Sequence, residues 1–299
     1  MALITELWQT GIVHAPAARL LDAKALHTAE ITWLPDPGPF RFNADPFGVK
    51  HDGGFTVMVE ALDYRIKRGE IHYYTYNADW SLARRGVALR QPFHLSYPSL
   101  IEDGGDIYML PEASRSGKLT LYRAERFPDR WQPVANLLDI PAIDASVIRH
   151  DERWWMFHAL PGEDNRAMRE LHVVHAPSLK GPWTQHSGNP VRTGLDASRP
   201  GGTPFVHEGK LHLPVQDCIG GYGVGLNILR IDDLTPDRFA AEVVSNLSPG
   251  RLLAGYNDGL HTLSACGDVT LIDVKRLHAS GARAWVDLER RITRAFGRR

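Results

Sequence analysis

The stretch Asp45–Ala61, DPFGVKHDGGFTVMVEA, consists of two apolar segments on either side of a tight Asp-Gly-Gly turn. This pattern is typical of a β-hairpin, because Asp and Gly tolerate the positive φ angles that short hairpin turns need. Four later stretches repeat it: Tyr97–Ala113 (YPSLIEDGGDIYMLPEA), Asp144–Ala159 (DASVIRHDERWWMFHA), Gly202–Asp217 (GTPFVHEGKLHLPVQD) and His261–Lys275 (HTLSACGDVTLIDVK). The chain therefore contains an internal repeat of hairpins.

The spacing of the hairpins predicts the architecture. They recur about every 50 residues with a further strand pair between them, which corresponds to one four-stranded sheet per repeat. Such a sheet is the blade of a β-propeller, so five hairpins predict an all-β, five-bladed propeller. The segment Leu7–Val13 reads as a strand that completes the last blade and closes the ring. A β-sandwich with chance self-similarity is the alternative.

Length and composition set limits on the function. At about 150 residues per domain, 299 residues suggest two domains, but the repeat predicts one propeller over residues 1–282. The net charge of −1 gives no reason to expect a nucleic-acid partner, since phosphate binding needs an excess of Lys and Arg. The two cysteines, Cys218 and Cys266, are too far apart in sequence for a zinc or redox pair.

The C-terminal tail, residues 283–299, reads as a basic amphipathic helix. Trp285, Leu288, Ile292 and Phe296 fall on one face, and the tail contains six arginines. We favour packing of this apolar stripe against the propeller rim, with peripheral contact to an anionic membrane as the alternative. Because no secretory signal or membrane span is visible, we expect a cytoplasmic protein, with contact at the inner membrane face under that alternative.

Two aspartates are candidates for acid–base chemistry. The innermost strand of each blade lines the central channel, and Asp45 and Asp144 occupy the same place in blades one and three. Asp is a poor strand former, although it can cap a turn. Two carboxylates that face one cavity shift each other's pKa values apart, as paired acid–base chemistry requires.

Short motifs around these aspartates resemble a known enzyme family. Ala44–Phe47 (ADPF) and Ile143–Val147 (IDASV) are similar to the first-blade and third-blade motifs of the five-bladed glycoside hydrolases of family 43. The resemblance implies that Asp45 is a general base and that Asp144 positions groups and tunes the pKa of the acid. It supplies no acid, because Ser198–Pro204 (SRPGGTP) lacks the Glu of those enzymes.

A second resemblance covers nearly the whole chain. Its motifs look like those of the N-terminal domain of glucosamine inositolphosphorylceramide transferases and of its free-standing bacterial relatives. They include Asn43–Phe47, Phe93–Pro98, Tyr108–Glu112, Arg199–Gly202 and Gln216–Cys218. This resemblance implies the same propeller fold. It carries no settled activity, and the glycosyltransferase domain of those proteins is not part of it, so we do not expect that activity here.

The ends of the second strands carry further polar candidates. Glu60 and Glu112 occupy equivalent places in blades one and two, and we align His158 with them in blade three and Gln216 and Asp217 in blade four. This is an unusual lining for apolar strands, so we expect a sugar-sized site. Burial beside other carboxylates would keep one acid protonated, and Glu112 is our first choice for the general acid, with Asp217 second.

The remaining candidates concern the ligand. The planar guanidinium of Arg199, in a Pro-Gly-Gly setting, suits a carboxylate or phosphate, so an acidic sugar or sugar phosphate is expected. His94, Tyr97, Tyr222, Asn227 and His261 are candidates for hydrogen bonds or stacking. No cofactor or metal motif is visible. A channel Ca²⁺ would fit similar propellers, but the sequence locates no cluster of oxygen ligands for one.

These observations leave three hypotheses. The first is an enzyme that cleaves a glycosidic bond, with Asp45 as base, Asp144 as orienting carboxylate, and Glu112 or Asp217 as acid. The second is a glycosyltransferase or glycoside phosphorylase of cytoplasmic glycan biosynthesis. The third is a non-catalytic glycan-binding propeller, which the incomplete acid motif favours.

Overall fold

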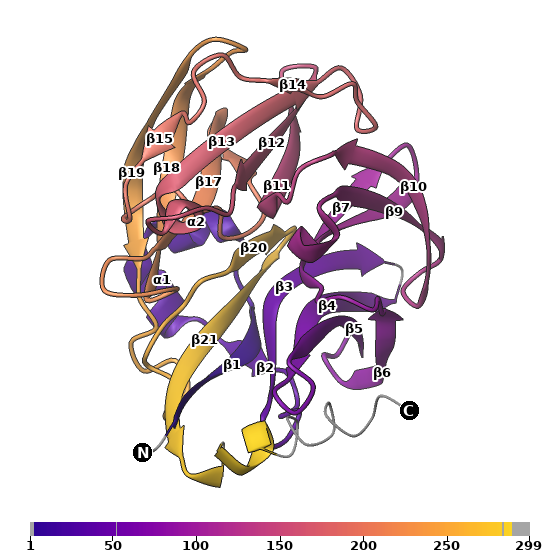
Figure 1. The fold of residues 1–299 in the computed structure, drawn as a ribbon, viewed down its shortest axis with the longest axis vertical. Helices are drawn as coiled ribbons and strands as arrows, with labels where there is room; N and C mark the ends of the chain where they lie inside the picture. The colour runs from indigo at the N-terminus through magenta and orange to yellow at the C-terminus, as the bar shows by residue number, and fades with distance from the viewer. Residues whose placement is uncertain (1–2, 52, 283, 289–299) are drawn as a thin grey trace.

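The computed structural model describes residues 3–51, 53–282 and 284–288. It contains five antiparallel sheets arranged around a common centre (Figure 1). The five-bladed, all-β propeller that the repeat predicts is therefore confirmed. Within the described residues, no helix is both long enough and apolar enough to cross a membrane.

The first four blades follow the chain in order. Blade one contains β3 (Arg41–His51), β4 (Gly54–Asp63), β5 (Arg68–Asn77) and β6 (Leu82–Leu89). Blade two contains β7 (Ser96–Asp103), β8 (Asp106–Glu112), β9 (Leu119–Arg126) and β10 (Arg130–Leu138). Blade three contains β11 (Ile143–His150), β12 (Arg153–Ala159), β13 (Glu170–Ala176), β14 (Thr184–Gln185) and β15 (Arg192–Thr193). Blade four contains β16 (Phe205–His207), β17 (Lys210–Asp217), β18 (Gly225–Leu234) and β19 (Phe239–Leu247).

Blade five joins the two ends of the chain. Its order is β2 (Ile31–Trp33), β1 (Leu3–Val13), β21 (Val269–Ser280) and β20 (Leu263–Cys266). The strand β1 pairs with β21 over its whole length, from Leu3 opposite Ser280 to Val13 opposite Thr270. The N-terminal strand thus closes the ring as predicted, although it begins at Leu3 rather than at Leu7.

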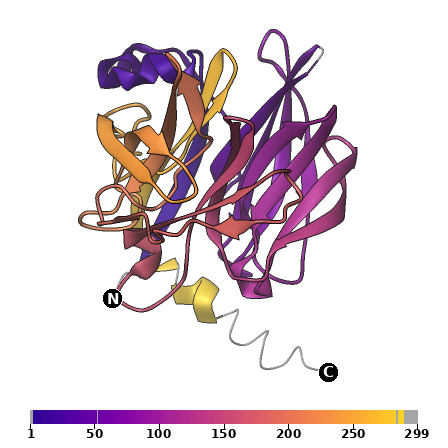
Figure 2. The same cartoon turned by 90° about the horizontal axis from the view of Figure 1, so that it is seen from above.

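Short helices occupy the connections. They are η1 (Ala17–Leu21), α1 (Ala23–Thr28), η2 (Ser114–Ser116) and α2 (Arg166–Arg169). Figure 2 shows α1, in indigo, on one side of the propeller and the N-terminus with the yellow C-terminal segment on the other. The innermost strand β20 is antiparallel to β21 and so begins at this second side, and Asp45 and Asp144 lie near the starts of the corresponding strands β3 and β11.

Apolar side chains join the blades. Five clusters of buried residues each combine two neighbouring blades: Met58 with Met109, Leu110 with Met156, Phe157 with Leu213, Ile228 with Ile272, and Ile12 with Val57. Each blade therefore packs both of its faces, so the fold needs a closed ring to bury its apolar surface.

The C-terminal segment differs from the expected arrangement. Residues 284–288 are helical, but Trp285 is 73% exposed and Leu288 is 46% exposed. The predicted packing of the tail's apolar stripe against the edge of the propeller is therefore wrong for these two residues. In this helical turn Val286 is the buried side chain instead, because the turn follows the end of β21 and presents a different face to the propeller. Ile292 and Phe296 lie outside the described residues.

Replacing Ile12 tests how much ring closure contributes to stability. Ile12 is completely buried between blades five and one, so Ile12→Ala should lower the free energy of unfolding by about 2–5 kcal/mol. Ile4→Ala, an exposed position on the same strand, should change it by less than about 0.5 kcal/mol. Urea unfolding followed by tryptophan fluorescence measures both. Equal effects would show that β1 does not anchor the ring.

Candidate active site

Three innermost strands share an unusual local conformation. Asp45 in β3, Tyr97 in β7 and Asp144 in β11 adopt left-handed backbone angles, with φ of 49°, 45° and 50°. The pairing of each strand with its neighbour shifts register at this point, which marks a β-bulge. A left-handed conformation costs a non-glycine residue about 1–3 kcal/mol. The bulge turns the backbone N–H of each residue out of the sheet and into the channel.

The freed N–H groups are satisfied by carboxylates of neighbouring blades. The N–H of Asp45 donates to Asp273 Oδ2 at 3.0 Å, and that of Tyr97 donates to Asp45 Oδ2 at 3.2 Å. The N–H of Asp144 points to Glu112 Oε2 at 3.4 Å. Because a buried N–H without an acceptor is costly, these contacts fix each carboxylate in the channel.

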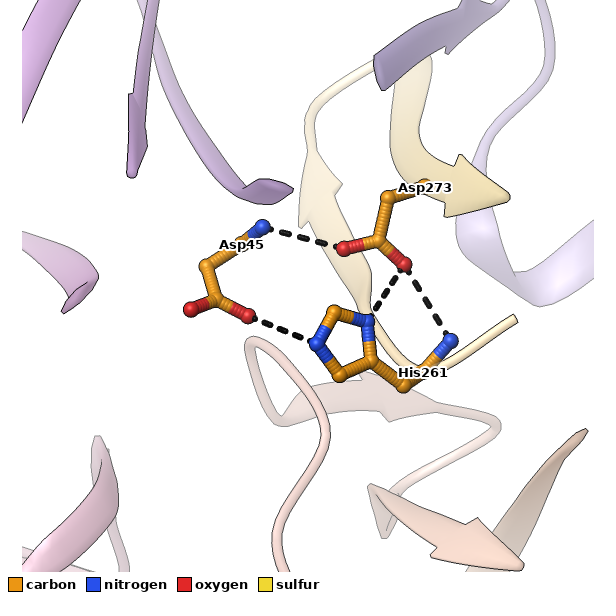
Figure 3. A group of neighbouring side chains, drawn as sticks. All are labelled: Asp45, His261 and Asp273. Carbon is orange, nitrogen blue, oxygen red and sulfur yellow. Dashed lines mark hydrogen bonds and ion pairs between the residues drawn. The ribbon is translucent and has the colours of Figure 1, made fainter. Parts of the chain in front are cut away.

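On one side of the channel, His261 lies between two carboxylates (Figure 3). Its Nδ1 is 2.7 Å from Asp273 Oδ1, and its Nε2 is 3.2 Å from Asp45 Oδ1. Burial by itself would lower the pKa of His261, but the charges of Asp273 and Asp45 raise it above its usual value. The ring of Trp8 stacks on the imidazole, with 3.8 Å between ring centroids. All of these groups are buried.

The surroundings of Asp45 set its pKa and the orientation of its oxygens. Burial raises the pKa of Asp45 to about 6, while the positive charge of His261 opposes this shift. The hydroxyl of Thr262 also donates to Asp45 Oδ1, at 3.2 Å. Asp45 is therefore a carboxylate at neutral pH, and its oxygens are oriented by a backbone N–H, a hydroxyl and an imidazole.

Asp45, His261 and Asp273 are also residue types that bind metal ions. The ligand atoms of Asp45, His261 and Asp273 lie within 4.8 Å of one another. They are already joined by hydrogen bonds, and two carboxylates with an imidazole do not match the six to eight oxygen ligands of Ca²⁺. The group fits a hydrogen-bonded triad better than a calcium site.

On the other side of the channel, Asp144 forms an ion pair with Arg199. Arg199 Nε lies 2.7 Å from Asp144 Oδ2, and Gln216 Nε2 donates to the same oxygen at 3.0 Å. Burial and the negative charge of Asp144 raise the pKa of Glu112 to about 8. The guanidinium of Arg199 also lies over the ring of Tyr222, 4.9 Å from its centroid. Glu112 is therefore protonated at neutral pH.

Glu60 is a second carboxyl beside Asp45. Burial and the nearby charge of Asp45 raise the pKa of Glu60 well above its usual value. His94 Nε2 lies 3.3 Å from Glu60 Oε1, and His94 Nδ1 accepts the N–H of Gly69 at 2.9 Å. Burial lowers the pKa of His94 to about 4, so its ring is neutral at neutral pH. Because Nδ1 accepts a hydrogen bond, Nε2 carries the proton and donates it toward Glu60.

The structure brings together most of the residues singled out from the sequence. This carboxyl cluster consists of Asp45, Glu60, Glu112, Asp144, Asp273 and His261, with His94, Arg199, Gln216 and Tyr222 around it. Glu112, His94, Arg199 and Tyr222 are only partly buried. These four side chains are the members of the cluster that are exposed in part to solvent, and we call them its opening.

His158 does not belong to the cluster. Ala44 pairs with Glu60 and Ser96 with Glu112, but the equivalent residue Ile143 pairs with Ala159. The alignment of His158 with the glutamates is therefore displaced by one residue. Since side chains alternate along a strand, this displacement places His158 on the opposite face. It is fully buried there, across from His172 in β13.

Tyr97 is enclosed rather than open to a ligand. Its side chain is fully buried, its hydroxyl lies 2.7 Å from Ser146 Oγ, and the N–H of Gly202 donates to it. It therefore joins blades two, three and four at the centre of the channel. This arrangement leaves no polar group of Tyr97 for a sugar.

Asp217 and Asn227 lie outside the hydrogen bonds of the cluster. Asp217 Oδ1 accepts the N–H of Ile219 at 2.9 Å in the turn that follows β17. Asn227 donates to the carbonyl of Asp196 at 2.6 Å and accepts a hydrogen bond from Asn246. Of the two candidates for the acid, Glu112 therefore lies in the cluster and Asp217 does not, while Asn227 holds loops together.

Sequence reasoning missed three members of the site: Asp273, Thr262 and Trp8. Asp273 left a signal, because it interrupts the apolar run Val269–Val274 (VTLIDV), where Asp is a poor strand former. Trp8 and Thr262 left none, because their roles depend on contacts with residues distant in sequence.

Substituting Asp273 tests whether it organises this half of the site. Its oxygens accept hydrogen bonds from the N–H groups of Asp45, His261 and Thr262 and face the His261 ring. Asp273→Asn should lower the free energy of unfolding by about 3–5 kcal/mol, because it breaks a buried ion pair. Asp268→Asn, at an exposed ion pair nearby, should cost less than about 1 kcal/mol. Denaturant titration measures both, and equal losses would contradict the role of Asp273.

Comparison with known proteins agrees with the motifs. The family described as "Glucosamine inositolphosphorylceramide transferase 1, N-terminal" matches residues 28–257. Glucosamine inositolphosphorylceramide transferase 1 of Oryza sativa subsp. japonica is 34% identical over 227 residues, which cover 73% of this chain and 30% of that protein. The Arabidopsis thaliana protein of the same name is 29% identical over 220 residues, covering 71% and 28%. The chain thus spans less than a third of the length of these relatives.

Solved structures share the fold. A family 43 β-xylosidase/α-arabinofuranosidase from a compost microbial metagenome superposes with a TM-score of 0.54 at 12% identity, covering 80% of this chain and 91% of that one. An exo-1,5-α-L-arabinanase from a bovine ruminal metagenomic library gives a TM-score of 0.54 at 11% identity, covering 72% and 87%. With a family match over most of its length and this fold, the chain belongs to the family of the N-terminal domain of glucosamine inositolphosphorylceramide transferase 1.

Proposed function

We propose that this protein is a carbohydrate-active enzyme that cleaves a glycosidic bond, with Asp45 as general base and Glu112 as general acid. One observation carries the proposal: two carboxyl groups of one buried cluster have pKa values on either side of neutrality, about 6 for Asp45 and about 8 for Glu112. At pH 7 the first is ionised and the second is protonated. These are the states that a base and an acid need before the reaction starts.

The neighbours of each carboxyl support these roles. Asp144, held by Arg199 and Gln216, keeps a negative charge beside Glu112 and so keeps the proton on Glu112. In the proposed reaction, Glu112 donates this proton to the departing glycosidic oxygen. Asp45 accepts a proton from the water that attacks the anomeric carbon. The role of Asp144 is to position Arg199 and to set the pKa of the acid.

Arg199 supports an anionic ligand, such as an acidic sugar or a sugar phosphate. Its Nε is used by Asp144, whereas its two terminal nitrogens have no hydrogen-bond partner among the described residues. A guanidinium with free terminal nitrogens can bind a phosphate or carboxylate through two hydrogen bonds. Because Arg199 is partly exposed at the opening of the cluster, a ligand can reach these nitrogens.

Transfer to a second sugar, or phosphorolysis, is the alternative chemistry at the same site. The relatives that match this chain are named transferases, and the free side of Arg199 could hold the phosphate of a donor or of inorganic phosphate. In transfer, Asp45 would take the proton from an acceptor hydroxyl instead of from water. A requirement for phosphate or for an activated donor would distinguish these reactions from hydrolysis.

Variants of the two proposed catalytic residues test the assignment. On a panel of aryl glycosides and sugar phosphates, Asp45→Asn should lower turnover by about 10²–10⁴-fold. Glu112→Gln should lose activity toward alkyl glycosides but keep it toward 2,4-dinitrophenyl glycosides, whose leaving group needs no proton. Chromatography of the released sugar measures both, with circular dichroism as the folding control. Full turnover by Asp45→Asn would refute the base, and loss in Asp217→Asn with an active Glu112→Gln would move the acid to Asp217.

The pH dependence of kcat/KM provides a second test. Activity should rise with pH as Asp45 loses its proton near pH 6 and fall as Glu112 loses its proton near pH 8. For a substrate with a 2,4-dinitrophenyl leaving group, which needs no proton, the parent protein and Glu112→Gln should both keep the rise at low pH and lack the fall at high pH. If the high-pH limb persists in this variant, another group must be the acid.

A further inference from the structure

Large apolar side chains are exposed on the side of the propeller that carries the carboxyl cluster, here called the site side. Ile4 is 68% exposed, and Ile66, Leu277, Trp285 and Leu288 are each at least 46% exposed. Ile219, in the loop after β17, is also exposed there. Burying such side chains is favourable, so a group of them on one side points to a surface that contacts something apolar.

Chain topology places these residues on the site side. Ile66 lies in the turn between β4 and β5, directly after the strand that carries Glu60. Ile4 and Leu277 lie where β1 begins and β21 ends, beyond Asp273 and Trp8. Figure 2 shows the N-terminus and the yellow C-terminal segment together on this side, with α1 on the opposite side.

The residues Ile4, Ile66, Leu277 and Trp285, which we call the apolar rim, lie around a projecting ribbon. The first residues of β1 pair only with β21, because β2 pairs no earlier than Gly11. Leu277 pairs with Glu6, and Ile4 pairs with Ala279, so Leu277 and Ile4 share one face of the ribbon. The hydroxyl of Tyr64 donates to the Glu6 carbonyl at 2.8 Å and ties the turn of Ile66 to the ribbon.

The rim is continuous with the site. On the same face of the ribbon, the next cross-strand pair inward from Leu277 and Glu6 is Lys275 and Trp8. Trp8 stacks on His261, which contacts Asp45. One face of the β1–β21 pair therefore leads from the exposed apolar side chains to the carboxyl cluster. A surface that covers the rim would lie beside the opening of the site.

Cations accompany the apolar side chains. Lys67, which is exposed, follows Ile66, and Arg276 precedes Leu277. Arg65 precedes Ile66 and forms an ion pair with Asp63. Apolar side chains set between cations suit the interface of an anionic bilayer, where the apolar groups enter the headgroup region and the cations meet lipid phosphates.

We propose that the apolar rim docks the site side onto an anionic lipid bilayer. The docked orientation turns the opening of the carboxyl cluster toward the membrane surface. Docking itself does not depend on the chemistry proposed above. The consequence that the substrate is a glycan presented at a membrane surface does rest on that proposed function.

Vesicle binding by the full chain tests the proposal. In co-sedimentation with sucrose-loaded vesicles, the protein should bind phosphatidylcholine vesicles that contain phosphatidylglycerol more tightly than pure phosphatidylcholine vesicles. The double variant Ile4→Ser/Leu277→Ser should bind the anionic vesicles at least about tenfold more weakly, since two apolar side chains no longer enter the interface. The matched control Leu82→Ser/Val206→Ser, on the opposite side, should bind like the parent protein.

Two further measurements separate the alternatives. Lys67→Gln should weaken binding to anionic vesicles only, and added salt should do the same. Asp45→Asn should bind vesicles like the parent protein, so failure of docking and failure of the proposed chemistry are distinguishable. Equal binding by the rim variant and its control, or no binding by the parent protein, would overturn the proposal. Loss of a dimer in the rim variant, seen by light scattering, would assign the rim to self-association instead.

Discussion

A buried backbone N–H must find an acceptor, and this constraint organises the centre of the propeller. The left-handed residues Asp45, Tyr97 and Asp144 remove three N–H groups from their sheets and aim them into the channel. The acceptors there are side-chain carboxyl oxygens of Asp273, Asp45 and Glu112. Each carboxylate is thus held by the backbone of the neighbouring blade. The hydrogen bonds between these N–H groups and the buried acids offset both the strain of the bulges and the burial of the acids.

Burial raises the pKa values of both Asp45 and Glu112, and the two halves of the channel then differ in the charges beside each group. Around Asp45 the cation is an imidazole shared with Asp273, so its stabilising charge is divided and burial still raises the pKa of Asp45. Around Asp144 the cation is Arg199, which stays charged at any accessible pH. Burial and the negative charge of Asp144 raise the pKa of Glu112 to about 8, so the proton stays on Glu112. His261 thus accompanies the lower pKa of Asp45, and the Arg199–Asp144 pair accompanies the higher pKa of Glu112.

The sequence predicted the fold and much of the site, because both follow from a local repeat. Hairpin turns and apolar alternation mark each blade, and equivalent positions in successive blades meet in the channel. The errors arise where register or long-range contact decides. In blade three, the alignment made from the sequence is displaced by one residue relative to the strand pairing. Because side chains alternate with a period of two, His158 lies on the face opposite to the predicted one. Asp273 reaches Asp45, which lies 228 residues away, so no local pattern announces that contact.

The strand β1 takes part in closing the ring, in the carboxyl cluster and in the apolar rim. Its end places Ile12 in the core between blades five and one, its middle stacks Trp8 on His261, and its start exposes Ile4 beyond the blade. A closing strand needs only enough length to complete a sheet, and β2 and β20 pair with the blade over far fewer residues. The β1–β21 pair therefore continues beyond the part of the blade that β2 and β20 cover. Because these residues run outward from the carboxyl cluster and carry exposed apolar side chains, the ribbon joins the cluster to the surface that we propose for docking.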